Sequence, residues 1–295
     1  METEFRMTLM AVPSSNADPQ RLGDPEVLQG WDLSRKQASN IAAKIRRGTG
    51  DLRSRFLLLG YYCKTMFRTK AAMKARSRQV LWMIEHLPGH SISKRGWCTL
   101  NYGILSDRDA IRQAKHLWNR HIETFSTDAR VIANAASFFA EMDEDAKAET
   151  LFNKAKQVDP NNPAWPRRLS SFFELRSRFA KSAKRKKLLA QKALAEAELA
   201  FKLEKSGYGK FLMLDDLAWK AYEAGDHAKS REYVHTIFEF AERTREEEIS
   251  SSCCKAIHNA HLVLGCVALK EGDVPAAVEH LLASVTVPEP SPENT

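Results

Sequence analysis

Three side chains toward the carboxyl end of the chain have the types and spacing that could hold a metal ion. Cys254, His258 and His261 follow one another at intervals of four and three residues, so they share one face of a helix. Zinc takes three or four such ligands, and neighbouring groups must orient them. Cys254 precedes the expected helix, however, and His261 occupies a position that packs against a neighbouring helix. We therefore predict no metal site and no cofactor.

Other residues with reactive side chains lack the partners that catalysis requires. Cys98 lies in an expected loop with no base near it in the sequence, so a nucleophilic role is unsupported. His86 and His90 flank the Pro88-Gly89 helix end and do not form a helical pair. Gly207-Tyr-Gly209 is too short to cradle a phosphate. We predict that the protein is not an enzyme.

Basic residues gather in two stretches, 52–84 and 175–195, each with eight basic residues and no acidic one. Such stretches could follow the phosphates of a polyanion, and that binding would be salt-sensitive and indifferent to sequence. The simpler interpretation, which we favour, is a solvated helix face and a solvated insertion. The candidate polyanion-binding residues are Arg68, Lys70, Lys74, Arg76, Arg78, Lys184, Arg185, Lys186 and Lys187.

The composition is that of an ordinary soluble chain. Of its 295 residues, 43% are hydrophobic and 28% charged, and only 13 Gly and 11 Pro are present, which favours helices over many-turned β structure. The net charge of +8 favours acidic partners. The five cysteines show no disulfide spacing, so we expect reduced thiols and a cytoplasmic location. No run approaches the roughly 18 apolar residues of a membrane span.

A spacing of 34 residues recurs along the chain. Ala114, Trp118 and the Phe125-Ser126 break return as Ala148, Phe152 and the Asp159-Pro160 break. Units of this length with small residues at fixed places are helix-turn-helix repeats that stack on their neighbours. The same pattern returns near the carboxyl end, in Leu264-Gly265, Ala268, Gly272-Asp273, Ala277 and Leu281.

The unit that begins at Asp128 shows the packing logic most clearly. Small Ala135, Ala136 and Ala148 let two helix backbones approach, while Phe139 and Phe152 fill the space beside them. This unit resembles a tetratricopeptide repeat, and the resemblance covers about residues 107–287. It implies an all-α, right-handed solenoid of antiparallel helix pairs. The segments 58–62 and 81–86 look like those of uncharacterised bacterial proteins with such repeats, which implies no activity.

These patterns divide the chain into four parts. We expect a disordered leader over 1–30. An N-terminal helical region follows over 31–106, and degenerate repeats would account for its helices. The repeat solenoid follows over 107–287, with a basic insertion near 174–188. The Pro-rich segment 288–295 is expected to be a disordered tail.

The resemblance also implies a concave face, lined by the first helix of each pair, whose outward residues contact extended peptides. Four of them, Arg130, Asn134, Arg167 and Arg168, resemble the peptide-carboxylate clamp of some family members, with Arg where those clamps often use Lys. The alternative is a solvated helix face. The remaining candidates for this groove are Ser171, Asp215, Trp219, Tyr222 and Asn259.

The sequence therefore predicts a protein–protein interaction scaffold or adaptor that lays a partner protein or peptide, acidic by charge complementarity, along the groove. The alternative is a helical-repeat protein that binds nucleic acid or another polyanion through 52–84 and 175–195. A third hypothesis is a regulatory subunit of an enzyme encoded elsewhere. Salt separates the first two, because phosphate-driven affinity falls steeply with ionic strength.

Overall fold

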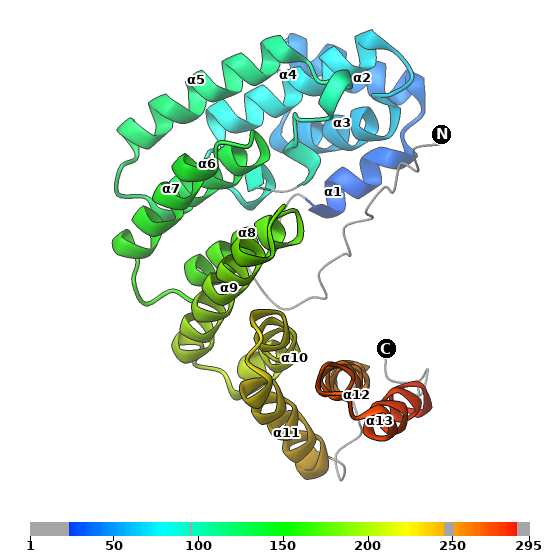
Figure 1. Cartoon of the computed structure of the whole chain (residues 1–295). Helices are drawn as coiled ribbons and strands as arrows, with labels where there is room; N and C mark the ends of the chain where they lie inside the picture. The colour runs from blue at the N-terminus through cyan, green and yellow to red at the C-terminus, as the bar shows by residue number, and fades with distance from the viewer. Residues whose placement is uncertain (1–23, 95, 245–250, 288–295) are drawn as a thin grey trace. The chain divides into compact units, whose positions relative to one another are not determined.

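A computed structural model describes residues 24–94, 96–244 and 251–287, and within them every regular element is a helix (Figure 1). The prediction of an all-α solenoid built from antiparallel helix pairs is confirmed. The chain divides into two compact units, residues 1–124 and 125–295. Helix α5 thus belongs to the first unit, although the repeat spacing placed it at the start of the solenoid.

The first unit contains five α-helices and four short 3₁₀ helices among its described residues. Polar side chains begin several of them, as the sequence indicates. Asp51, for example, accepts a hydrogen bond from the Ser54 backbone N–H at 2.8 Å and so caps α3. The elements are α1 Asp24–Gln29, η2 Gly30–Asp32, α2 Arg35–Arg46, α3 Leu52–Thr65, α4 Lys70–His86, η3 Ser91–Lys94, η4 Gly96–Cys98, η5 Gly103–Leu105 and α5 Arg108–Thr124.

The prediction of a disordered leader over 1–30 is wrong for residues 24–30, which form α1 and the start of η2. Their backbone lies directly against α3. A Cβ atom on Gly60 would stand 1.8 Å from the Val27 carbonyl oxygen, and one on Gly30 would stand 2.1 Å from that of Leu57. Only glycine permits this approach. Residues 1–23 and the predicted tail 288–295 lie outside the described part of the chain.

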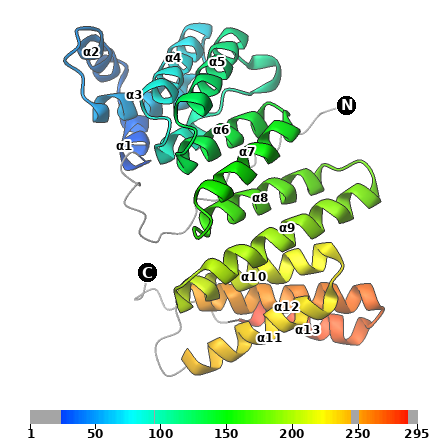
Figure 2. The ribbon, with the colours of Figure 1, turned by 90° about the vertical axis from the view of Figure 1, so that its left-hand side faces the viewer.

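The second unit is a stack of four helical hairpins among its described residues, seen side-on in Figure 2. We call α6, α8, α10 and α12 the first helices of these hairpins. The hairpins are α6 Ala129–Glu141 with α7 Asp145–Val158, α8 Ala164–Arg178 with α9 Ala183–Leu203, α10 Gly207–Ala224 with α11 His227–Thr244, and α12 Ser251–Glu271 with α13 Val274–Thr286.

The residues that defined the repeat pattern lie in the core of this unit. Ala135, Ala136 and Ala148 are fully buried, and Phe139 and Phe152 are only 1% and 3% exposed. The Gly-Asp turns also form as expected. Gly225 has φ +80°, and the following Asp226 accepts from the Lys229 backbone N–H to begin the second helix of its hairpin.

The expected basic insertion near 174–188 lies in the end of α8, a short connection and the start of α9. The additional residues lengthen both helices, which have 15 and 21 residues, and do not form a separate loop. The Ser177 hydroxyl donates to the Lys186 carbonyl oxygen at 3.0 Å, which joins the two extensions. The hairpin α8–α9 therefore projects beyond its neighbours as a helical extension.

One described helix, Ser252–Glu271 within α12, passes as membrane-spanning by length and composition alone. Several of its apolar residues pack in the core of the second unit. Ala260, Val263 and Val267 are at most 1% exposed and pack with Val234 and Ile237 of α11. With 44% of its window buried in this way, this one helix is weak evidence for a membrane span.

We predict that Ala148→Leu destabilises the protein by about 1–3 kcal/mol, because the larger side chain overfills the contact between α6 and α7. Lys186→Ala, at an exposed position on α9, is the control and should be nearly neutral. Thermal unfolding of the two variants checks this. Equal effects would contradict the repeat alignment.

Candidate functional site

Arg168 on α8, one of the predicted clamp residues, reaches across to α6. Its Nη1 donates to the Asn134 Oδ1 at 3.1 Å, and its Nη2 donates to the Ala133 carbonyl oxygen at 2.6 Å and the Ser137 hydroxyl at 2.7 Å. Asn134 is 2% exposed. Burial lowers the pKa of Arg168 to about 9. Arg168 and Asn134 therefore join two consecutive first helices and are not displayed for a ligand.

The other two predicted clamp residues are exposed. The Arg130 Nε lies 3.7 Å from the Asp128 carboxylate. The Arg167 Nη2 lies 3.6 Å from the Glu204 carboxylate and contacts the Met213 sulfur at 3.2 Å. The four side chains are thus divided: two hold helices together, and two remain at the surface beside carboxylates.

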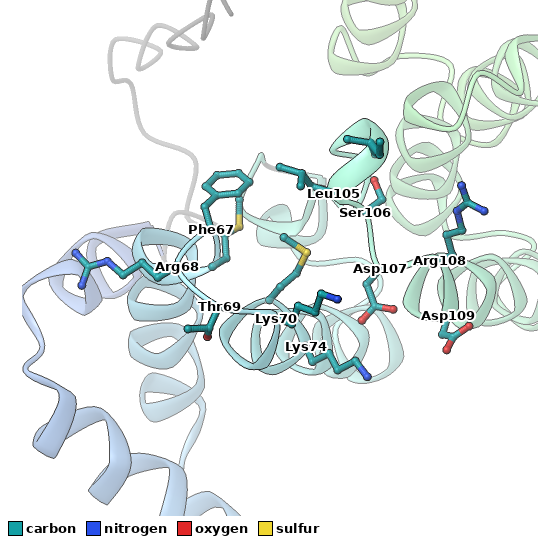
Figure 3. Close-up of a pocket in the computed structure, with 13 residues that line it drawn as sticks. Phe67, Arg68, Thr69, Lys70, Lys74, Leu105, Ser106, Asp107, Arg108 and Asp109 are labelled. Carbon is teal, nitrogen blue, oxygen red and sulfur yellow. The ribbon is translucent and has the colours of Figure 1, made fainter.

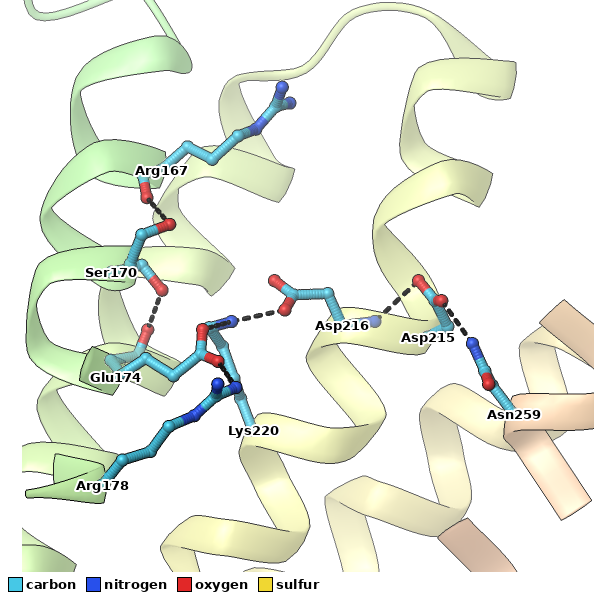
Figure 4. Close-up of polar contacts among 10 residues, drawn as sticks. Arg167, Ser170, Glu174, Arg178, Asp215, Asp216, Lys220 and Asn259 are labelled. Carbon is cyan, nitrogen blue, oxygen red and sulfur yellow. Dashed lines mark hydrogen bonds and ion pairs between the residues drawn. The ribbon is translucent and has the colours of Figure 1, made fainter. Parts of the chain in front are cut away.

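A second connection joins α8 to α10 through Lys220 (Figure 4). The Lys220 Nζ donates to the Glu174 carboxylate at 2.7 Å and to Asp216 one turn before it, and its side chain is only 4% exposed. Burial favours the neutral amine, but the attraction of Asp216 and Glu174 outweighs burial and raises the pKa of Lys220. This ammonium is charged at neutral pH and donates to two carboxylates.

The third connection joins α10 to α12. The Asn259 side-chain amide donates to the Asp215 carboxylate at 2.9 Å. Trp219 and Tyr222 meet edge to face at 5.9 Å and are half-buried against the core of α10, α11 and α12. Among the predicted groove residues, Ser171 is exposed, and its hydroxyl donates to the Arg167 carbonyl oxygen one turn before it at 3.1 Å.

The structure adds exposed apolar side chains on α8 and α10 that the sequence analysis missed. Leu175 lies one turn after Ser171 on α8, and Tyr208 and Leu212 lie one turn apart on α10. These three are between 42% and 47% exposed. Periodicity could not separate them from core residues, because an apolar residue at helical spacing is normally buried. We define Ser171, Leu175, Tyr208 and Leu212 as the first-helix stripe.

Arg76, a predicted polyanion-binding residue, is buried at 2% exposure. Its guanidinium donates to the carbonyl oxygens of Trp97 and Thr99 at 2.6 and 2.7 Å, and so holds the connection after α4 in place. It is therefore not available to an external anion. The other candidates of this stretch, Arg68, Lys70, Lys74 and Arg78, are exposed and form no ion pair with a described residue.

The second basic stretch contains both paired and unpaired cations. Arg176 and Lys192 pair with Asp145 and Glu149 of α7 at 2.7 and 2.9 Å, respectively. Lys184, Arg185, Lys186 and Lys187 are exposed and have no ion pair within the described part of the chain. They occupy the first turns of α9, where the helix dipole is positive.

The residues considered for metal binding have other contacts. Cys254 is buried, and the His258 Nδ1 lies 2.8 Å from the Ser284 carbonyl oxygen of α13. The His261 Nδ1 lies 3.4 Å from the His280 Nδ1. Across residues 24–94, 96–244 and 251–287, no three or more His, Cys, Asp or Glu side chains are placed to hold a metal ion.

The fold defines the class of this protein: an all-α helical-repeat protein built from stacked antiparallel hairpins. No family model and no curated protein sequence matches the chain. It is similar to the structure of a human IFIT1 dimer with m7Gppp-AAAA, at 16% identity and a TM-score of 0.47, over 90% of this chain and 58% of that one. It is also similar to the structure of a human IFIT1 dimer with PPP-AAAA, at 14% identity and a TM-score of 0.39, over 88% of this chain and 72% of that one.

The chain thus spans less than two thirds of the first of these structures. Similarity at these scores carries no information on ligands. The resemblance of segments 58–62 and 81–86 to bacterial repeat proteins finds no support in these comparisons.

We predict that Arg168→Ala destabilises the second unit by about 2–4 kcal/mol, because it removes the three hydrogen bonds that the guanidinium donates to Asn134, the Ala133 carbonyl oxygen and the Ser137 hydroxyl of α6. Arg130→Ala is the matched control, since Arg130 is exposed on the neighbouring first helix, and it should change the free energy of unfolding by less than about 0.5 kcal/mol. Urea unfolding measures both. Similar losses would show that Arg168 is not a connection between helices.

We further predict that the second unit loses stability below neutral pH through His261. Burial and the adjacent His280 lower the pKa of His261 in the folded state. Below about pH 6.5 the histidine of the unfolded chain takes up a proton before that of the folded chain does. The contribution of His261 to the free energy of unfolding is therefore present above that pH, and it is lost as the pH falls through the lower folded-state pKa. The difference in melting temperature between pH 7.5 and pH 5.5 should be smaller for His261→Gln than for the unmodified chain. An unchanged difference would exclude His261 as the source.

Proposed function

We propose that this protein is a scaffold or adaptor, without catalytic activity of its own, that holds a partner protein or peptide on the first-helix stripe of α8 and α10. The observation that supports this most directly is the exposure of Leu175, Tyr208 and Leu212 between first helices that polar contacts already hold in place. A partner would meet apolar contact points that need little ordering upon binding, which favours affinity.

Charge completes the description of the partner. Exposed Arg130 and Arg167 lie on α6 and α8, the latter on the same side of its helix as Ser171 and Leu175. Their ion pairs with Asp128 and Glu204 are long and exposed, at 3.7 and 3.6 Å, so they are weak and leave both cations able to attract acidic side chains of a partner. The five thiols are free, and this supports a cytoplasmic location as part of the proposal.

The experiment is an affinity purification of the tagged full chain from its own cells, read by mass spectrometry. We expect Leu175→Asp/Leu212→Asp to lower retention of a discrete protein partner at least tenfold. The matched control is Leu188→Asp/Leu199→Asp, which changes two exposed leucines on the second helix α9 and should retain the partner. Equal loss in both pairs, or in neither, would reject the stripe as the binding surface.

Polyanion binding is the second candidate function, and one observation favours it. Lys184, Arg185, Lys186 and Lys187 lie at the positive end of α9 with no acidic residue in its first turn, so they repel one another and the helix dipole. A bound polyanion would relieve this repulsion.

Repeating the same purification with nuclease, and at low and high salt, distinguishes this function from the first. A protein partner retained under both treatments supports the scaffold. Co-purified nucleic acid that is lost at high salt, and lost with Lys186→Glu/Lys187→Glu, would instead establish polyanion binding.

A further inference from the structure

The first unit contains a cleft that the proposed function does not use. It lies between the start of α4 and the segment that leads from η5 into α5, and has a volume of about 520 Å³ (Figure 3). This size falls within the roughly 300–1,000 Å³ of typical ligand pockets. Residues that line it include Phe67, Lys70, Met73, Lys74, Leu105 and Arg108.

The cleft exposes an unusual amount of apolar surface. Phe67 and Leu105 are each 51% exposed, and Ile104 beside them is 96% exposed. In Figure 3, Phe67 and Leu105 lie next to each other on one side of the cleft. The Phe67 ring meets that of Tyr102 edge to face at 5.6 Å, which restrains it. Adjacent exposed apolar side chains of this kind mark interaction sites more often than scattered ones do.

The charges around the cleft are unbalanced. Arg68, Lys70, Lys74 and Arg108 form no ion pair with a described residue. The two carboxylates of the lining are both engaged within α5. Asp107 accepts from the Ala110 backbone N–H at 3.2 Å, and Asp109 pairs with Arg112. In Figure 3, Lys70 and Lys74 lie on the side of the cleft opposite Phe67 and Leu105, whereas Arg68 points away from it. The free charge at the cleft is therefore that of two lysines and Arg108.

We propose that this cleft binds an acidic peptide segment of a partner protein, which packs one bulky apolar side chain against Phe67 and Leu105. Its carboxylates would then lie against Lys70 and Lys74. The amino-terminal turn of α4, where the helix dipole is positive, contributes to the same attraction. The proposal concerns the first unit alone, so it stands or falls separately from the first-helix stripe.

The lining favours a peptide over a nucleic acid. A single-stranded nucleic acid needs open aromatic faces on which bases stack and a continuous basic path for its phosphates. The cleft offers one exposed aromatic ring, Phe67, among aliphatic and methionine side chains. An apolar side chain flanked by carboxylates fits this lining of apolar side chains beside two lysines.

The test measures fluorescence anisotropy of labelled 12-residue peptides with the full chain. One peptide places Leu and Phe among Glu and Asp residues, a second replaces the two apolar residues by Ser, and a third replaces the acidic residues by Lys. An oligonucleotide of equal negative charge is the fourth probe. We expect only the first peptide to bind well, with Lys70→Glu/Lys74→Glu and Leu105→Asp each weakening it at least tenfold.

The matched control is Lys36→Glu/Lys44→Glu, which reverses two exposed lysines on α2 of the same unit and should bind the first peptide as the unmodified chain does. Circular dichroism of each variant shows whether it folds. Equal binding of the Ser peptide or of the oligonucleotide would overturn the proposal in favour of simple polyanion attraction. Absence of binding by the first peptide, or equal weakening by the α2 control, would also overturn it.

Discussion

The structure of the second unit depends on polar contacts between consecutive first helices. A solenoid has no contacts between distant repeats, so each hairpin is held only by its neighbours. Arg168 joins α8 to α6, Lys220 joins α10 to α8, and Asn259 joins α12 to α10. Each of these contacts fixes how two consecutive first helices lie against each other, and so where their outward side chains stand.

Buried charges make these contacts specific as well as stabilising. Lys220 is almost inaccessible, and removing either carboxylate that it contacts would leave a buried ammonium without full compensation. A shift of one hairpin along its neighbour would do the same, so the ion pair fixes the stagger of α8 and α10. On the second helices, Lys156 and Glu196 meet at 2.6 Å to join α7 and α9, at partly exposed positions where an ion pair contributes less.

The sequence predicted most features that depend on adjacent residues, and it missed contacts between helices that are far apart in the chain. Helix caps such as Asp51, the buried Ala148 and the turn at Gly225 follow from short-range rules, and each is found as expected. Alignment assigned Asn134 and Arg168 to the predicted concave face but could not show that they bind each other across 34 residues. The α1 segment was missed because Gly30 and Gly60 make its contact through backbone, which leaves no apolar periodicity.

The contacts that each cation makes decide how much of the net charge of +8 is available to a ligand. Cations with nearby carboxylates, such as Arg176 and Lys220, contribute to the fold and have little charge left for a ligand. Charge counted along the sequence does not separate these cations from the exposed ones, which is why Arg76 was assigned to a polyanion site although it binds carbonyl oxygens inside the first unit. The unpaired cations lie beside exposed apolar side chains at the cleft of α4, and beside solvent at the start of α9. Because apolar contact adds affinity that salt does not screen, the first of these environments suits a persistent protein partner better than the second.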